Sequence, residues 1–309
     1  MNEKIKLLAD NIEKVIIGKR EVILKLAAAL LSGGHVLIED VPGVGKTRLV
    51  SALSESVNGE CRRIQFTPDL MPSDITGFSM INTKTGVSEY KSGAAMCNFL
   101  LADEINRASP KAQSALLEIM EELQVSVDGV THQLPQPFMT LATQNPVETY
   151  GTYHLPEAQM DRFIMKLSIG YPNPSEEMQI LEKNSGEKSR LPAVMTLDDV
   201  IELKKQAENV KTHESVKRYV VDIVNATRSS EFTVLGASPR GSIALYTAAK
   251  AFALINGRNY VVPDDVKCLA VEVLAHRLML SPKGKSVHGN PEAVMRAILA
   301  DVAIPQAQV

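Results

Sequence analysis

Short apolar runs alternate with amphipathic segments in the first half of the chain. The run HVLIE at residues 35–39 is bounded by Gly33-Gly34 before it and by a glycine-containing turn after it, which is typical of a strand buried on both faces of a parallel sheet. Further strands are expected at RIQF, NFLLA, FMTLAT and FIMKLSI. Helical spacing over residues 20–32 and 46–57 places helices before and after the first strand. The alternation predicts an α/β fold with a parallel sheet.

No strand pattern is evident beyond Pro172, and the rest of the chain has helical spacing. Helices are expected near 175–185, 197–209, 213–228, 239–256, 264–280 and 291–303. The polar segment NSGEKSRLP carries turn-forming residues between two periodic segments, so we place a domain boundary near residue 185. The prediction is an α/β domain at 1–185 and a smaller all-helical domain at 186–309.

Charge and cysteine content narrow the class of protein. The formal net charge of the 309 residues is -3 and the basic residues are scattered, which argues against nucleic acid or an anionic membrane as partner. Cys61, Cys97 and Cys268 are far apart and lack metal-ligand spacing, so we expect buried thiols in a reducing compartment. No signal core or membrane span is apparent, and a cytoplasmic location follows.

The segment DVPGVGKT, from Asp40 to Thr47, follows the first expected strand and opens a helix. This context is that of a phosphate-binding loop, in which backbone N–H groups and a helix N-terminus converge on an anion. Its cofactor-binding residues are Pro42, Gly43, Val44, Gly45, Lys46 and Thr47. Lysine would neutralise the β- and γ-phosphates and threonine would bind Mg²⁺. Asp40 stands where glycine is usual, which is acceptable if its φ is not positive.

A second motif places acidic and amide side chains at strand ends. The run NFLLA leads into Asp103 and Glu104, at the edge where open parallel sheets bind ligands. Asp103 can hold Mg²⁺, and Glu104 can orient and deprotonate the attacking water. Asn145, after FMTLAT, can hydrogen-bond that water or a γ-phosphate oxygen. The alternatives are that the two acids cap the following turn and that Asn145 is only part of a turn.

The ordered set GKT, LLADEINRASPKAQSALLE, ATQNP, LPEAQMDRF and ASPRG resembles the MoxR family of AAA+ ATPases over nearly the whole chain. The resemblance implies a P-loop αβα core with a helical lid, ATP/ADP and Mg²⁺ as ligands, and a homo-oligomeric ring, usually hexameric. It also implies that Arg162 is an arginine finger acting on the neighbouring subunit, although a surface pair with Asp161 is the alternative.

Two further sites are similar to family elements. Ser238-Pro239 reads as N-cap and first helical residue, which places Arg240 in the first turn of a helix, as in the family's second sensor. Whether Arg240 acts on its own site or on a neighbour's stays open, and simple solvation is the alternative. Ile16, Ile17 and Gly18 resemble the segment that packs against adenine, and core packing explains them nearly as well.

Two insertions and the family resemblance suggest the function. Residues 67–92 are rich in turn formers, and residues 123–134 alternate about Asp128-Gly129, which predicts a hairpin. The expected function is an ATP-hydrolysing, chaperone-like factor that remodels a protein partner, in this family often one with a von Willebrand factor A domain. Alternatives are the ATPase subunit of a metal chelatase, a nucleic-acid motor, or a scaffold that binds ATP with little turnover.

Overall fold

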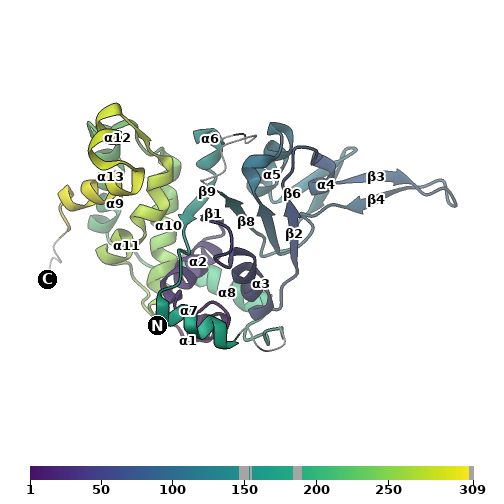
Figure 1. Ribbon diagram of the computed structural model, residues 1–309, viewed down its shortest axis with the longest axis horizontal. Helices are drawn as coiled ribbons and strands as arrows, with labels where there is room; N and C mark the ends of the chain where they lie inside the picture. The colour runs from purple at the N-terminus through teal and green to yellow at the C-terminus, as the bar shows by residue number, and fades with distance from the viewer. Residues whose placement is uncertain (146–152, 154, 184–189, 306–309) are drawn as a thin grey trace.

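The computed structural model describes residues 1–145, 153, 155–183 and 190–305. A five-stranded parallel sheet forms the centre of the α/β part, in the order β2-β5-β8-β1-β9 (Figure 1). Its strands are β1 (His35–Glu39), β2 (Cys61–Gln65), β5 (Phe99–Asp103), β8 (Met139–Gln144) and β9 (Phe163–Leu167). Because all five run in the same direction, their carboxyl ends share one edge, and the predicted strands are confirmed.

Both faces of the sheet are covered by helices (Figure 1). Along β1, Val36 and Ile38 belong to one apolar cluster and Leu37 to the other, so the strand is buried on both sides. The first cluster packs against α1 (Glu3–Glu13), α2 (Arg20–Leu31) and α3 (Lys46–Ser56). The second packs against α5 (Pro110–Glu122). A short 3-10 helix, η1 (Ile105–Arg107), joins β5 to α5.

Two hairpins interrupt this core: the one at 123–134 is the hairpin that Asp128-Gly129 predicts, and the other lies in the segment 67–92, where the sequence indicated only a turn-rich insertion. The segment 67–92 contains α4 (Pro72–Thr76) and the antiparallel pair β3 (Gly77–Ile81) and β4 (Ser88–Ser92), which extends far from the sheet (Figure 1). The second pair is β6 (Gln124–Val127) and β7 (Val130–Gln133). Asp128 and Gly129 turn it with φ of 49° and 78°, the positive values that a tight two-residue hairpin needs.

The C-terminal part is helical with one short ribbon. Its helices are α7 (Pro174–Lys183), α8 (Leu197–Glu208), α9 (Glu214–Ser229), α10 (Pro239–Ile255), α11 (Pro263–Leu274), α12 (Pro282–His288) and α13 (Pro291–Asp301). The expectation of no strands is corrected by β10 (Thr233–Leu235) and β11 (Met279–Leu280), which pair antiparallel. The helix expected over 264–280 ends earlier, in the 3-10 turn η2 (Ala275–Arg277) that leads into β11. A further short helix, α6 (Glu157–Met160), precedes β9.

The helical part packs closely on the sheet. One apolar cluster runs without a break from α1–α3 into α8–α11 and α13. At the carboxyl end of β9, Lys166 makes 2.7 Å ion pairs with Glu39 of β1 and Glu292 of α13. These contacts fix the position of the lid against the sheet. The domain boundary predicted near residue 185 lies outside the described residues.

The structure also tests the expected burial of the cysteines and the expected lack of a membrane span. Cys97 is buried and Cys61 half-buried, whereas Cys268 is exposed on α11, so the expectation of three buried thiols is wrong for Cys268. All three are free cysteines. Within the described residues, no helix combines the length and apolar composition that crossing a bilayer requires.

Candidate active site

The phosphate-loop sequence forms an open backbone turn between β1 and α3. Gly43 and Gly45 have φ of 88° and 96°, a conformation that side-chain-bearing residues rarely adopt. A Cβ added at Gly43 would meet nothing within 4 Å, and one at Gly45 would meet only the Cδ1 atom of Ile16 at 3.8 Å. The glycines therefore shape the turn and leave its surface open beside the N-terminus of α3, where a phosphate group would be favoured.

Lys46 and Thr47 form the first turn of α3, directly after the N-cap Gly45. The Nζ atom of Lys46 donates to the carbonyl oxygen of Asp40 at 2.7 Å, so the ammonium group lies across the loop. Thr47 is exposed, as are Pro42 and Gly43, whereas Val44 is half-buried. The loop thus presents an ammonium group and a hydroxyl group from adjacent residues, as its sequence predicts.

Asp40 has a structural task that explains why it replaces glycine. Its side chain is only 8% exposed, and its carboxylate accepts hydrogen bonds from the Ser168 hydroxyl at 3.0 Å and from the backbone N–H groups of Ile169 and Gly170. Its φ is not positive, so the condition set by the sequence is met. The aspartate ties the carboxyl end of β1 to the segment after β9 without entering the anion-binding turn.

Asp103 ends β5 at the same sheet edge as the loop. Its Oδ1 accepts from the hydroxyl of Thr143 at 2.5 Å, and its Oδ2 accepts from the guanidinium of Arg63 at 2.7 Å. Thr143 belongs to β8, the strand between β5 and β1. Side chains of the two neighbouring strands therefore hold this carboxylate at the edge where the loop lies.

Glu104 adopts a backbone conformation that is unusual for its residue type. Its φ is 55° and its ψ 51°, a left-handed geometry that costs energy and tends to occur at functional sites. Its carboxylate accepts from Gln65 Nε2 at 2.7 Å and from Arg107 Nη1 at 2.9 Å, and its N–H donates to the Thr143 hydroxyl at 2.9 Å. The side chain makes no capping bond to η1, which removes the simple capping alternative.

Asn145 is buried and follows β8, the strand that separates β5 from β1. The sheet order therefore places Asn145 between the acidic pair and the phosphate loop. The segment 146–152, which includes the proline of the Asn-Pro turn, lies outside the described residues. The structure thus gathers the loop, Asp103, Glu104 and Asn145 at one edge, in the arrangement that the parallel sheet predicts.

The donor set suits a magnesium nucleotide. Mg²⁺ usually takes one or two protein ligands and fills its shell with water and substrate phosphates. Thr47 and Asp103 are the predicted pair, and the described residues hold no group of three or more His, Cys, Asp or Glu side chains suited to caging a metal. The turn at Gly43 and Gly45 is open, as a backbone cradle for phosphates would require. When bound, Mg²⁺ would neutralise charge on the phosphates.

The segment Ile16-Ile17-Gly18 lies beside the phosphate loop. Ile16 is buried with its Cδ1 near Gly45, Ile17 is half-buried, and Gly18 is exposed with a φ of 72°. A Cβ on Gly18 would overlap the carboxylate of Glu176 on α7. Ile16 belongs to the apolar core, as the core-packing alternative expects, and contact of this segment with a base stays a prediction.

Arg162 lies at the other edge of the sheet, because it directly precedes β9. Its Nη1 atom pairs with Glu121 Oε2 at 2.8 Å and donates to the carbonyl oxygen of Leu117 at 2.6 Å. Asp161 pairs with Arg277 instead, so the alternative of a local Asp161–Arg162 pair does not occur.

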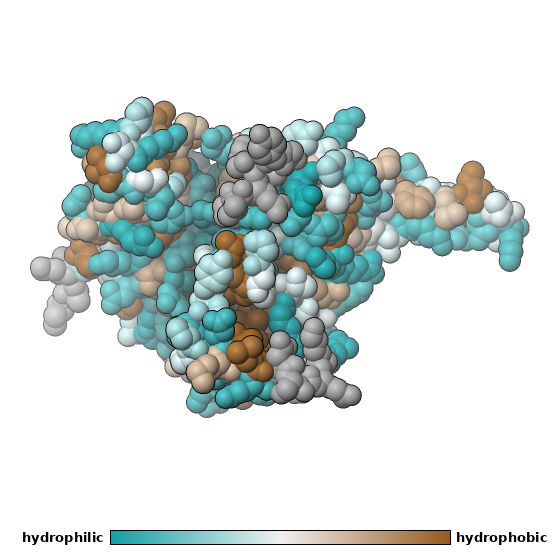
Figure 2. All heavy atoms as spheres, viewed as in Figure 1, coloured by the Kyte–Doolittle hydropathy of each residue, from teal (hydrophilic) through white to brown (hydrophobic). Residues whose placement is uncertain are grey.

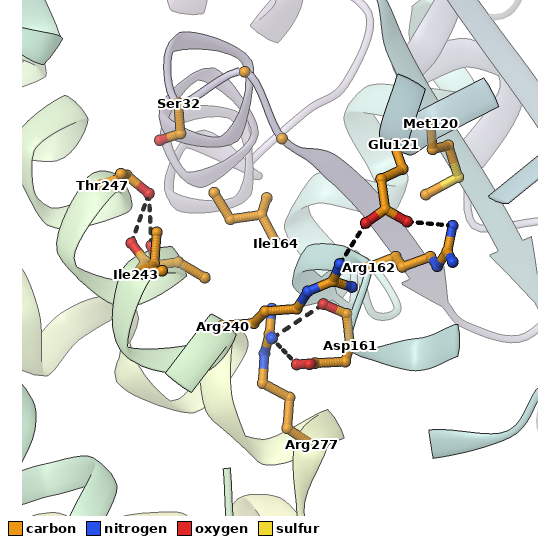
Figure 3. Close-up of a pocket in the computed structure, with 13 residues that line it drawn as sticks. Ser32, Met120, Glu121, Asp161, Arg162, Ile164, Arg240, Ile243, Thr247 and Arg277 are labelled. Atoms are coloured by element: carbon orange, nitrogen blue, oxygen red, sulfur yellow. Dashed lines mark hydrogen bonds and ion pairs between the residues drawn. The ribbon is translucent and has the colours of Figure 1, made fainter. Parts of the chain in front are cut away.

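Arg240 lies beside Arg162 (Figure 3). Ser238 caps α10 by accepting from the Arg240 N–H at 3.1 Å, and Pro239 is the first helical residue, as predicted. The Arg240 guanidinium pairs with Glu121, so it is not merely solvated. Both arginines line a cavity of about 320 Å³ together with residues 33–34, which precede β1. At about 3.3 Å per residue, the length of β1 puts roughly 15 Å between this cavity and the phosphate loop.

The sequence did not single out several side chains that contact the predicted site residues, among them Arg107, which pairs with Glu104. Gln65 contacts Glu104, Arg63 and Thr143 contact Asp103, and Glu121 contacts both arginines. Gln65 is the last residue of β2 and Thr143 the last but one of β8, so their places at the carboxyl ends of strands could have indicated them, whereas Arg63 lies in the middle of β2. No sequence signal marks Glu121, since its partners come from distant segments.

The chain matches the family described as "ATPase family associated with various cellular activities (AAA)" over residues 35–165 and the "AAA lid domain" over residues 225–298. An uncharacterized Bacillus subtilis protein, YeaC, is 52% identical over 298 residues, covering 96% of this chain and 93% of that protein. Chaperone MoxR1 of Mycobacterium tuberculosis is 42% identical over 304 residues, covering 96% and 81%. The crystal structure of a putative ATPase from Cytophaga hutchinsonii has a TM-score of 0.91 and 39% identity, covering 98% and 95% of the two chains. Sequence and fold agree along nearly the whole length, and the chain belongs to the MoxR family of AAA ATPases.

Proposed function

We propose that this ATPase is a chaperone-like factor that forms a hexameric ring and hydrolyses ATP between adjacent subunits. It uses the ATPase cycle to remodel a protein partner. The observation that carries the proposal is the separation of its site residues. The phosphate loop and the acidic pair lie at one edge of the sheet, and the two arginines lie at the other.

The edge at the carboxyl ends of the strands would bind and activate the reactants. Lys46 and the loop N–H groups hold the phosphates, while Thr47 and Asp103 hold Mg²⁺. Glu104 orients the attacking water and takes its proton, and Asn145 positions that water or a γ-phosphate oxygen. The bond between Gln65 and Glu104 supports this role, because it fixes the carboxylate that must face the water.

The arginines would complete the site of the next subunit. A guanidinium that stabilises charge on the transferring phosphoryl group must come close to it. In their own chain, Arg162 and Arg240 are separated from the loop by the length of β1, whereas a neighbour's loop can meet them when subunits pack head to tail. This supports action in trans for both, including Arg240, whose direction the sequence left open.

A protein partner is supported by the exposed hairpin β3–β4. Phe78, Met80, Ile81 and Val87 on this hairpin are 45–67% exposed, and Figure 2 shows apolar side chains along the projecting arm. MoxR1 is named a chaperone, which agrees with a protein client. A client with a von Willebrand factor A domain belongs to this proposal by family resemblance. The net charge of -3 gives no support to a nucleic-acid motor.

Mixing two inactive variants tests the shared site. Arg162→Ala subunits keep the phosphate loop and the acidic pair intact, and Glu104→Gln subunits keep Arg162 and Arg240 intact. If the arginines act in trans, mixed oligomers should recover hydrolysis at interfaces that join an intact edge to intact arginines. Energy transfer between labelled subunits can show that the subunits have exchanged. If exchange is shown and hydrolysis still does not recover, action in trans is refuted.

Affinity capture tests the client. Glu104→Gln protein with ATP should retain a partner that Lys46→Ala protein does not, because only the first variant holds the triphosphate. Captured candidates should then raise the ATPase rate of the wild-type protein in purified form. Failure of every purified candidate to change that rate or its own conformation in the presence of ATP would contradict the remodelling role.

A further inference from the structure

One carboxylate connects the two arginines. The Oε2 atom of Glu121 pairs with Arg162 Nη1 at 2.8 Å, and its Oε1 atom pairs with Arg240 Nη2. Figure 3 shows Glu121 between the two guanidinium groups, with one oxygen toward each. Because each oxygen pairs with a different arginine, this single side chain bridges the two guanidinium groups.

The three side chains come from three separate elements. Glu121 lies in the last turn of α5, Arg162 precedes β9 and Arg240 lies in the first turn of α10. Glu121 therefore links the α/β part to the lid. A second link runs beside it, because the Ser238 hydroxyl donates to Asp161 Oδ2 at 2.8 Å. This bond joins the start of α10, which carries Arg240, to the residue before Arg162.

Arg277 supports this second link by pairing with Asp161. It is only 5% exposed, pairs with Asp161 and donates to the carbonyl oxygens of Phe163 at 2.7 Å and Val273 at 2.8 Å. Burial lowers the pKa of the Arg277 guanidinium, and Asp161 opposes that effect. The segments that carry Arg162 and Arg240 are thus held by buried contacts, while Glu121 bridges the two guanidinium groups and the Leu117 carbonyl oxygen gives Arg162 a second bond.

The cluster keeps the capacity to bind an anion. Glu121 is 40% exposed, Arg162 30% and Arg240 53%, so all three can be reached from outside. Two guanidinium groups and one carboxylate leave a net charge of +1. A guanidinium has five N–H donors, and the bonds of Arg162 to Glu121 and to Leu117 both leave from Nη1, so its Nη2 and Nε groups take no part in them. Glu121 therefore arranges the arginines without using up their donors.

We propose that Glu121 is a positioning residue that holds Arg162 and Arg240 as a pair, so that both approach the terminal phosphate of the nucleotide bound to the neighbouring subunit. This inference rests on the proposed action of the arginines in trans. Glu121 reduces the repulsion between two like charges and fixes their spacing before the neighbour's nucleotide arrives. The preorganised pair then needs little rearrangement to stabilise charge on the phosphoryl group.

Substitution of Glu121 should slow turnover more than it weakens nucleotide binding. For Glu121→Gln, which removes the charge at nearly constant size, we expect kcat to fall roughly tenfold to a hundredfold while KM changes less than about twofold. Glu121→Asp keeps the charge on a shorter side chain and should recover part of kcat. Glu122→Gln, an exposed neighbour on α5, is the matched control and should behave as wild type. Thermal melting of each variant reports any loss of folding.

Mixed oligomers distinguish positioning from a general structural effect. We combine Glu104→Gln subunits, which donate intact arginines, with Arg162→Ala subunits, which contribute intact loop edges. Adding Glu121→Gln to the arginine-donating subunit should abolish most of the recovered hydrolysis. The same substitution in the Arg162→Ala subunit should leave recovery unchanged, because the arginine pair of that subunit is already disabled.

The remaining outcomes overturn the inference. Equal losses for both placements would mean that Glu121 only maintains the fold, and a rise in kcat would mean that it withholds the arginines. Wild-type kcat for Glu121→Gln, with Arg162→Ala inactive, would refute the role of Glu121 and leave the proposed function standing. Wild-type kcat for Arg162→Ala itself would refute the proposed function, and the inference about Glu121 would fall with it.

Discussion

The buried aspartate at the start of the phosphate loop allows a quantitative test. We consider Asp40→Asn, which preserves the size of the side chain and one carbonyl oxygen. The carboxylate accepts from the Ser168 hydroxyl and from the N–H groups of Ile169 and Gly170, all of which are donors. An asparagine can offer only one acceptor atom to these groups, and its NH₂ group must face a donor.

The expected loss follows from these contacts. At 8% exposure, the carboxylate is shielded from water, so a donor that loses its partner is not readily rehydrated. Leaving one buried donor unpaired costs about 1–3 kcal/mol, and hydrogen bonds to a charged acceptor are stronger than those to a neutral one. Asp40→Asn should therefore lower the free energy of unfolding by about 2–4 kcal/mol. For a chain of this length that corresponds to a fall in the melting midpoint of roughly 4–8 °C.

Thermal unfolding of the purified variants is a direct assay. Asp222→Asn is the matched control, because Asp222 is exposed on α9 and should tolerate the same chemical change. A melting midpoint for Asp40→Asn within about 1 °C of wild type, the range expected for a surface site, would refute the structural role. The aspartate would then be no more than a tolerated departure from glycine.

Other predictions concern catalysis and pH. Lys46→Ala should abolish binding of a fluorescent ATP analogue, and binding at wild-type affinity would contradict the assignment of the loop. Glu104→Gln should bind the analogue with little change while phosphate release falls at least about a hundredfold, and retained turnover would exclude Glu104 as the base. Burial lowers the pKa of His35 to about 4, so the unfolded chain binds the proton more readily than the folded one. The contribution of the neutral side chain to stability is therefore complete above about pH 6.5 and declines as the pH falls toward 4. Between pH 6.5 and 5 the loss should be about 2 kcal/mol from this residue, and urea unfolding of His35→Asn should show a shallower pH dependence; an unchanged slope would contradict it.

The periodicity of the sequence predicts the sheet because its strands are buried on both faces. HVLIE and NFLLA form continuous apolar runs, and the two faces of the sheet bury alternate residues of each run. The ribbon β10–β11 was not predicted, because its strands are short and partly exposed rather than buried on both faces. Its strands have three and two residues, too few for an alternating pattern, and Val234 and Leu235 are exposed. Pairing between residues about 45 positions apart, rather than local propensity, creates this ribbon.

The carboxyl-edge residues were predictable because each ends a strand of a parallel sheet. Asp103, Asn145 and the phosphate loop come together through strand order alone. The left-handed backbone of Glu104 was not predictable, since residue type gives no reason for a positive φ at glutamate. Gln65 was missed because it gains its role only through a contact with a residue 39 positions away.

The direction in which Arg240 acts depends on lid docking, which no local pattern encodes. The helix start at Ser238-Pro239 was readable, but the position of that helix is set by apolar packing of α10 on α2 and by the bond from Ser238 to Asp161. These contacts bring Arg240 to the edge where Arg162 already lies. A lid docked over the carboxyl ends of the strands would have directed the same arginine to its own nucleotide. The packing of α2 against the lid therefore underlies the proposal that Arg240 acts on a neighbouring subunit's ATP.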